Sequence, residues 1–300
     1  MAIEIIIRPK RFKKNIKLLE LLSLLEPTHG IGTPSLHFTL ENVQGNSPDS
    51  EKQLLIFDRK NIGRGFGVIL EKDYIKMTLS AGASISDITI FYDYLDKISA
   101  KLQANTFDQN GKTYNFEERD MIIEKTKLFI VNNLNVKIIE KKKNCILGAL
   151  LPIVLEDGFI EELAKVPINE QLSLYSKYIN DKQQIQAYYV KPVLYQDQQD
   201  NRRAWGLYVI SENVLSIFPI KPRDPFFTEG HKLKDHIINI IYDQKKDNTY
   251  KELYIDFADF VNNIDLNSYE KFDQNNILIK LKRQDIKPLI PFNIEIEEMS

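Results

Sequence analysis

Residues 54–79 read LLIFDRKNIGRGFGVILEKDYIKMTL, and the elements that this stretch predicts set the architecture of the chain. Three apolar runs, Leu54–Phe57, Phe66–Leu70 and Tyr74–Leu79, are separated by polar or glycine-containing segments, which is typical of consecutive antiparallel strands. A capping sequence follows at Ser84–Asp87. The apolar residues after it recur at helical spacing, at Ile88, Phe91, Leu95, Ile98 and Leu102. The stretch therefore predicts a small sheet followed by a packed helix.

A second stretch repeats this order of elements. Shifting the sequence by 139 residues aligns Lys52–Leu79 with Lys191–Phe218 without a gap. Five aligned pairs are identical: Lys52 with Lys191, Leu55 with Leu194, Asp58 with Asp197, Arg64 with Arg203, and Gly67 with Gly206. Strands are expected again at residues 186–195, 205–210 and 214–220, followed by a helix with Leu233, His236, Ile237, Ile240 and Ile241 on one face.

We therefore predict an α+β fold of two similar halves, each a small, mainly antiparallel sheet with packed helices, related by internal duplication. The charged cluster Glu140–Asn144 marks the boundary between an N-terminal α+β half, residues 1–140, and a C-terminal α+β half, residues 141–300. The alternative is two unrelated α+β domains whose hairpins share turn chemistry.

Composition excludes several classes of protein. The 43% hydrophobic and 27% charged residues are typical of a globular chain, and 40 basic against 42 acidic residues leave a net charge of −2. This balance argues against general attraction to nucleic acid or to an anionic membrane. The basic segment 8–17 is the one patch that suggests nucleic acid, but Phe12 is its only aromatic residue, so we expect no nucleic-acid binding. The single Cys145 excludes an intramolecular disulfide, and Glu20 interrupts the one stretch that looks like a signal peptide. We expect a cytoplasmic protein without a membrane segment.

The glycine-rich stretch Gly63–Gly67 looks like a phosphate-binding loop. Such a loop leads from a strand into a helix, whereas these glycines lead directly into a strand. Alternate glycines leave one face of a strand without side chains, so the stretch predicts close packing of a neighbouring element. Asp58 with Arg64, and Asp197 with Arg203, are expected to bridge the ends of their hairpins as solvated pairs, with a ligand site as the alternative.

No cofactor or metal pattern is present among the four histidines, because His231 and His236 are five residues apart and no cysteine pair accompanies them. Acidic pairs such as Asp93 with Asp96, and Asp256 with Asp259, suit solvated helix faces better than acid–base sites.

The loop at residues 219–231 is the most site-like segment of the sequence, because it combines prolines, charged side chains and aromatic rings. The alternative is a rigid connection whose aromatic rings cover the sheet. We take as candidate binding residues the charged and aromatic members of this loop and the arginines of both hairpins. They are Arg223, Asp224, Phe226, Phe227, His231, Arg64 and Arg203. No catalytic residue is assigned.

Residues 62–66, IGRGF, followed by Ser86-Asp87-Ile88 and by residues 91–95, FYDYL, resemble an uncharacterised family of bacterial proteins of about 300 residues. The resemblance implies no activity. We interpret the chain as a non-catalytic cytoplasmic protein-interaction protein of the regulatory, adaptor or immunity type, whose protein partner and oligomeric state the sequence leaves open. The alternative is a hydrolase or transferase with a carboxylate and histidine site between the halves.

Overall fold

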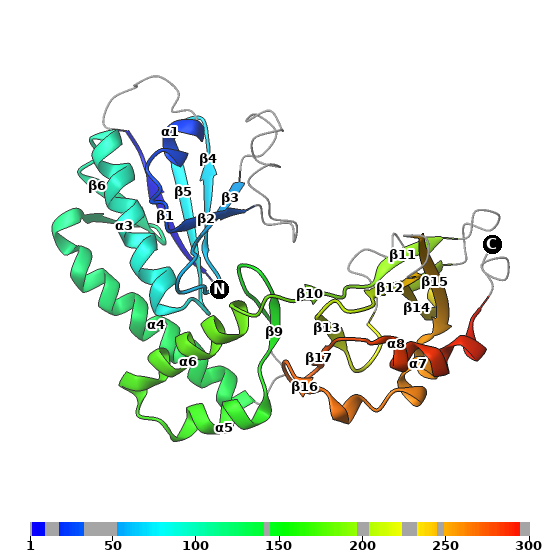
Figure 1. Ribbon diagram of the computed structural model, residues 1–300. Helices are drawn as coiled ribbons and strands as arrows, with labels where there is room; N and C mark the ends of the chain where they lie inside the picture. The colour runs from blue at the N-terminus through cyan, green and yellow to red at the C-terminus, as the bar shows by residue number, and fades with distance from the viewer. Residues whose placement is uncertain are drawn as a thin grey trace. The chain divides into compact units, whose positions relative to one another are not determined.

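The computed structural model describes residues 2–9, 18–32, 53–140, 145–196, 204–223, 233–244 and 249–294. It divides the chain into two compact units, residues 1–185 and 186–300, each with its own sheets (Figure 1). The expected boundary after residue 140 falls inside the first unit. The reason is that α5 and α6, which follow that position, pack against α4, and the Tyr175 hydroxyl donates a hydrogen bond to the Gly82 carbonyl oxygen at 2.7 Å.

The N-terminal unit contains a seven-stranded sheet in the order β2-β3-β4-β5-β1-β6-β7. Its strands are β1 (Ala2–Ile7), β2 (His29–Gly32), β3 (Gln53–Asp58), β4 (Phe66–Leu70), β5 (Ile75–Ser80), β6 (Thr106–Gln109) and β7 (Lys112–Asn115). All neighbours are antiparallel, and β1 lies between β5 and β6. The three predicted strands of residues 54–79 are therefore confirmed, and they are consecutive in the sheet.

Helices pack beside this sheet, with α3 and α4 side by side (Figure 1). The helical elements are α1 (Leu18–Leu22), α3 (Ile85–Leu102), the 3-10 turn η1 (Phe116–Glu118), α4 (Arg119–Glu140), α5 (Asp157–Lys165) and α6 (Ile168–Gln183). A short hairpin of β8 (Cys145–Leu147) and β9 (Pro152–Val154) precedes α5. The predicted apolar face of α3 is buried, and Phe91 packs edge-on against Phe66 of β4. Ser84 caps α3 as predicted, in a capping box with Asp87.

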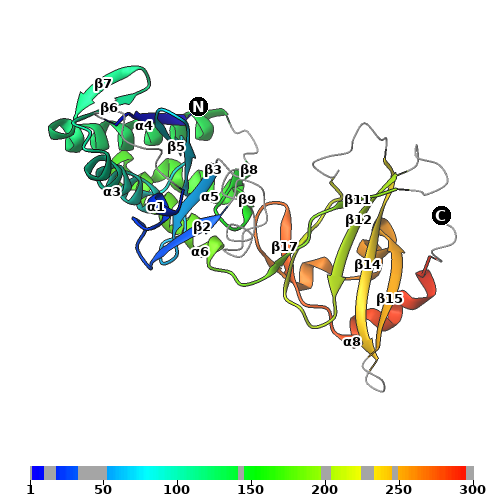
Figure 2. The same ribbon diagram turned by 90° about the horizontal axis from the view of Figure 1, so that it is seen from above.

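The C-terminal unit contains two four-stranded sheets, β10-β13-β17-β16 and β11-β12-β14-β15. The second of these sheets is seen clearly in Figure 2. The elements are β10 (Tyr188–Tyr189), β11 (Val193–Gln196), β12 (Ala204–Ser211), β13 (Ser216–Pro219), β14 (Leu233–Gln244), β15 (Thr249–Asp256), α7 (Phe257–Asn263), η2 (Leu266–Ser268), β16 (Glu270–Lys271), β17 (Asn276–Ile279), α8 (Arg283–Ile286) and η3 (Lys287–Phe292). Its core joins both sheets to α7 and η3, with Tyr208, Phe218 and Phe260 fully buried.

The α+β class is confirmed, but the helix expected around residues 233–241 is wrong, because these residues form β14. Isoleucines at positions 237, 238, 240 and 241 fit helical spacing, yet they are β-branched and cover both faces of a strand. Ile238 and Ile240 enter the main core, while Ile237 packs with Trp205 on the opposite face.

The internal duplication is not confirmed. The two hairpins do share their register, since Leu55 pairs with Gly67 and Leu194 pairs with Gly206. The following strands differ, because β4 pairs with β5 in an antiparallel manner, whereas β12 pairs in parallel with β14 and β13 joins the other sheet.

Candidate functional site

A pocket of about 260 Å³ lies in the C-terminal unit, where the loop after β13 meets β14 and the start of α7. Two carboxylates, a histidine and an amide contribute its polar groups: Asp235, Asp256, His236 and Asn262. Its walls are mainly apolar, and the described lining residues that complete it are Ile220, Pro222, Phe257, Ala258 and Val261. The lining therefore suits a small ligand with an apolar body and a group that binds carboxylates.

Backbone geometry fixes the polar residues of this pocket. Asp256 caps α7 by accepting a hydrogen bond from the Ala258 N–H at 2.7 Å. The Asp235 carboxylate accepts one from the His236 N–H at 3.1 Å. The His236 ring lies against Gly206 of β12, where a Cβ atom would come within 2.6 Å of the ring. A side chain at Gly206 would therefore displace His236.

Arg223 follows the pocket residue Pro222 and is held in place by the core. The hydroxyl of the buried Tyr208 donates to the Arg223 carbonyl oxygen at 2.7 Å and accepts from its N–H at 2.6 Å. The guanidinium donates to Asn276 Oδ1 at 3.0 Å, and to the Asn275 carbonyl oxygen and the Tyr189 hydroxyl, each at 3.3 Å. These bonds anchor the start of the predicted loop, so Arg223 has a structural role.

The sheet β11-β12-β14-β15 presents a second feature, which we call the outer face. One side of this sheet is buried in the main core of the unit. On the other side, Trp205 and Ile237 form a small cluster against which Tyr195, Leu207, Tyr254 and Ile294 pack. The outer face consists of these side chains together with Val193, Asn239 and Glu252, which occupy strand positions of the same alternation.

Polar groups on the outer face form their own network. The Asn239 amide Nδ2 donates to Glu252 Oε2 and to the Tyr254 hydroxyl, both at 3.2 Å, and the Tyr254 hydroxyl donates to Glu252. Burial, and then the hydrogen bond to Glu252, raises the pKa of Tyr254 to about 12. Asn239 is only 6% exposed, and its Oδ1 accepts no hydrogen bond from the described residues.

Of the predicted binding residues, only Arg64 and Arg223 lie within the described ranges. Arg64 belongs to the N-terminal unit and Arg223 to the C-terminal unit. The predicted residues that lie outside the described ranges are Arg203, Asp224, Phe226, Phe227 and His231. The Asp197–Arg203 pair also lies outside them.

The expected Asp58–Arg64 pair is wrong. Asp58 accepts hydrogen bonds from Lys60 N–H at 2.8 Å, Asn61 Nδ2 at 3.1 Å and the Ser86 hydroxyl at 3.0 Å. The Arg64 guanidinium instead donates from Nε to the Leu147 carbonyl oxygen at 3.0 Å. Asp58 therefore stabilises its own turn and the start of α3.

The glycine stretch is held by a buried carboxylate. Asp87 accepts hydrogen bonds from the backbone N–H groups of Arg64, Gly65 and Ser84, each at 2.8 Å. Burial raises the pKa of Asp87, and these three donors act in the opposite direction. A Cβ atom on Gly63 would lie 2.3 Å from the Asp87 carboxylate. Gly63 and Gly65 precede β4 and do not lie in a strand, but they admit a close neighbour, as predicted, and the backbone N–H groups of Arg64 and Gly65 are bonded to this side chain.

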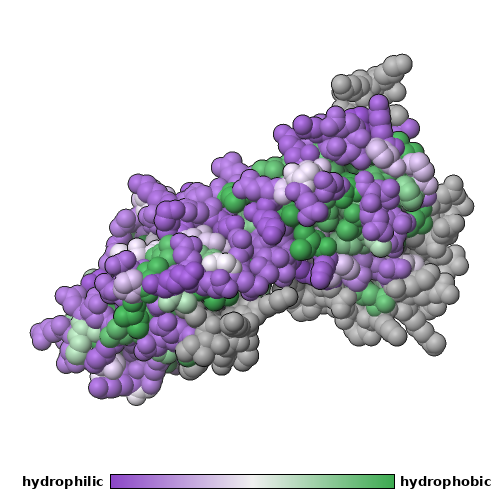
Figure 3. Space-filling model, turned by 90° about the horizontal axis from the view of Figure 1, so that it is seen from below, coloured by the Kyte–Doolittle hydropathy of each residue, from purple (hydrophilic) through white to green (hydrophobic). Residues whose placement is uncertain are grey.

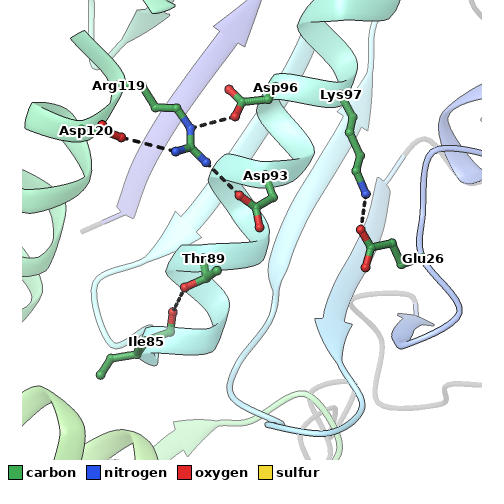
Figure 4. Close-up of polar contacts among 8 residues, drawn as sticks. All are labelled: Glu26, Ile85, Thr89, Asp93, Asp96, Lys97, Arg119 and Asp120. Atoms are coloured by element: carbon green, nitrogen blue, oxygen red, sulfur yellow. Dashed lines mark hydrogen bonds and ion pairs between the residues drawn. The ribbon is translucent and has the colours of Figure 1, made fainter. Parts of the chain in front are cut away.

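Figure 4 shows the contacts of Asp93 and Asp96, the acidic pair on α3. Arg119 of α4 bonds Asp93 and Asp96, each at 2.8 Å, and also lies 3.5 Å from Asp120. Burial raises the pKa of Asp96, while the Arg119 charge opposes that shift. Nearby, Lys97 bonds Glu26 at 2.7 Å (Figure 4). These ion pairs connect α3 to its neighbours, and we assign no chemistry to them.

Sequence reasoning missed the pocket and the outer face. Asp235 and His236 were expected on a helix, and Asp256 on a solvated face. The signal that identifies them is the four β-branched isoleucines among residues 237–241, which favour a strand and so set which residues share a face.

Comparison with known protein families gives a match over nearly the whole chain. A family model for a domain of unknown function, DUF4299, matches residues 2–289. The chain belongs to the DUF4299 family. This confirms the resemblance to an uncharacterised family. No curated protein and no solved structure matches the DUF4299 chain.

The described residues of the DUF4299 chain contain neither a membrane-spanning helix nor a metal-binding cluster. None of its helices in the described ranges has the length and apolar character needed to span a bilayer. Among the same residues, His, Cys, Asp and Glu side chains form no group of three arranged to hold a metal ion.

Proposed function

We propose that the DUF4299 protein is a non-catalytic cytoplasmic protein-interaction protein of the regulatory, adaptor or immunity type, and that the outer face of its C-terminal unit is the contact surface. The observation that carries this proposal is a cluster of aromatic and aliphatic side chains that the main core of the unit does not cover. Large apolar side chains reach the surface in both units (Figure 3). On this sheet the half-buried Tyr195, Leu207 and Tyr254 pack around the buried Trp205. Tryptophan and tyrosine are the residues that contribute most at protein interfaces.

The exposure of this sheet supports the same conclusion. Val193 on the edge strand β11 is 42% exposed, and Tyr250 on β15 is 76% exposed. Tyr195 and Leu207 are half-buried beside Trp205. A partner that covers this surface gains the free energy of removing apolar area from water, about 25 cal/mol per Å².

Affinity capture from the native host tests the proposal. The full-length protein should capture one protein in stoichiometric amount, identified by mass spectrometry, and the double substitution Val193→Ser with Tyr195→Ala should abolish that capture. The control is Val214→Ser, because Val214 is 41% exposed in the same unit but lies in the turn after β12. Absence of a stoichiometric partner, or capture that is the same in all variants, contradicts the proposal.

A hydrolase or transferase is the second candidate, and the pocket with Asp235, His236 and Asp256 is the observation that favours it. Histidine and carboxylate side chains supply general acid and base groups. All the described lining residues of this pocket belong to the C-terminal unit, so this candidate differs from the enzyme site between the halves that the sequence suggested. Turnover of chromogenic esters, phosphates or glycosides that Asp235→Asn and His236→Gln both remove would support an enzyme. A rate equal to that of buffer alone would oppose it.

A further inference from the structure

We propose that the outer face binds a basic, arginine-containing extended segment of a partner protein. The arginine side chains stack on the aromatic rings of the face and bond to the carboxylates at its borders. This inference rests on the proposed interaction function, and it names the chemistry of the partner. Three independent features of the face carry it: the aromatic rings, the signs of the charges around them and one buried acceptor.

The aromatic rings provide surfaces for a planar cation. The Tyr195 and Trp205 ring centroids are 6.2 Å apart, and Tyr254 packs on the same cluster. Trp205 is 4% exposed, so its ring forms the floor while the tyrosines are half-buried beside it. A guanidinium stacks on such rings and retains hydrogen-bond donors at its edge.

At the described strand positions of this face, the charges bordering the rings have one sign. Asp235 is the register partner of Trp205 on the neighbouring strand, and Asp256 is the register partner of Ile237. Glu252 lies beside Tyr254 and bonds its hydroxyl. No lysine or arginine occupies the strand positions that the structure places on this face. Complementary charge therefore requires a basic segment, and the phosphates of nucleic acid or anionic lipid would be repelled.

The buried amide of Asn239 identifies the kind of group that is bound. Its Nδ2 is bonded to Glu252 and Tyr254, whereas its Oδ1 accepts no hydrogen bond from the described residues. A buried acceptor without a donor costs free energy, which a bound donor recovers. Asn239 Oδ1 and the Glu252 carboxylate together offer acceptors to N–H donors, and arginine carries five such donors in a fixed plane.

Trp205 is the only tryptophan of the chain, so its fluorescence reports on this face directly. The full-length protein is titrated with peptides of about ten residues that alternate glycine with arginine, lysine, glutamate or serine. The arginine peptide should give a saturable change in Trp205 emission, tighter than the lysine peptide. Its affinity should weaken when ionic strength rises from about 0.05 M to about 0.5 M.

Charge-neutral variants define the site. Asp235→Asn with Glu252→Gln should weaken binding of the arginine peptide about tenfold, because it removes two of the three border carboxylates without changing side-chain size. Glu161→Gln with Glu162→Gln is the control, since it removes the same net charge from exposed positions of α5 in the N-terminal unit and should leave the affinity unchanged. Far-UV circular dichroism confirms that all variants remain folded.

Several results would overturn the inference. They are binding of the glutamate or serine peptide as tight as that of the arginine peptide, equal weakening in the control, and no saturable change up to about 1 mM arginine peptide. Tight binding of a single-stranded oligonucleotide or of anionic vesicles through the same variants would also contradict it. If a host partner is captured through Val193 and Tyr195 but the arginine peptide does not bind, the interaction function stands and only the basic partner is wrong.

Discussion

The carboxylate of Asp87 accepts a hydrogen bond from the backbone N–H of Gly65 at 2.8 Å, although Gly65 precedes it by 22 residues. Through this bond and those from Arg64 and Ser84, one buried side chain joins the glycine stretch to the N-terminus of α3. Gly65 has a φ of +71°, and a Cβ atom there would lie 2.6 Å from the Ile56 carbonyl oxygen. The sequence that looks like a phosphate loop is therefore a connection built around a protein carboxylate.

Replacement of this carboxylate should destabilise the N-terminal unit. Asp87→Asn leaves one acceptor oxygen for three backbone donors, so the free energy of unfolding should fall by about 3 kcal/mol in urea titrations followed by circular dichroism. Asp120→Asn removes a carboxylate that is 95% exposed and should change it by less than about 0.5 kcal/mol. Equal stability of the two variants would show that Asp87 does not hold the loop.

Glycine substitutions should separate close packing from backbone flexibility. Gly63→Ala forces a methyl group against the Asp87 carboxylate and should cost about 2 to 4 kcal/mol. Gly158→Ala on α5 meets nothing within 4 Å and should be neutral or stabilising by up to about 1 kcal/mol. Thermal unfolding of the two variants checks this, and a Gly63→Ala protein as stable as the parent would contradict the packing argument.

Protonation of His29 should make the stability of the N-terminal unit depend on pH. Burial lowers the pKa of His29 from its ordinary value of 6.5, and its Nδ1 accepts a hydrogen bond from the Glu26 N–H at 3.2 Å. The unfolded state therefore binds the proton more readily, so stability should fall as the pH decreases through 6.5. His29→Gln should lose less stability than the parent between about pH 7.5 and about pH 5.5. An unchanged loss would assign the effect to other groups.

Truncation should distinguish the two boundaries. Residues 1–185 should fold cooperatively, because they retain α6, whose Tyr175 bonds Gly82 and whose Asn180 accepts from the Ile62 N–H at 2.8 Å. Residues 1–140 lack these contacts and should show no cooperative transition in urea. Cooperative unfolding of the shorter fragment would restore the boundary expected from the charged cluster.

Local patterns predicted the N-terminal unit well. The runs around Ile56, Val68 and Met77 alternate in burial within one antiparallel sheet, and the cap at Ser84 sets the start of α3. Such features depend on neighbouring residues, so a single sequence contains them. The role of Asp87 was not predictable in this way, because its partners at Arg64 and Gly65 come from an earlier loop.

The C-terminal unit was harder to predict for a related reason. Isoleucines at β14 fit helical spacing, and only their β-branched character and burial on both faces reveal a strand. A helix at this segment would not place Asp235 and His236 beside Trp205 and Gly206 of β12, so these contacts were not predicted. Their juxtaposition depends on the parallel register of β12 with β14, which no local pattern shows.

That parallel register has a consequence for how the chain acquires its structure. Strands β3, β4 and β5 are joined in sequence, so each pairing closes a short loop. Strand β12 instead pairs with β14 only after β13 has left for another sheet, so this contact closes a longer loop. Because such closure costs more conformational entropy before any contact forms, we expect the β12–β14 pairing to form after the β3–β4–β5 pairings, so that Trp205 emission recovers later in refolding than the first gain of far-UV circular dichroism.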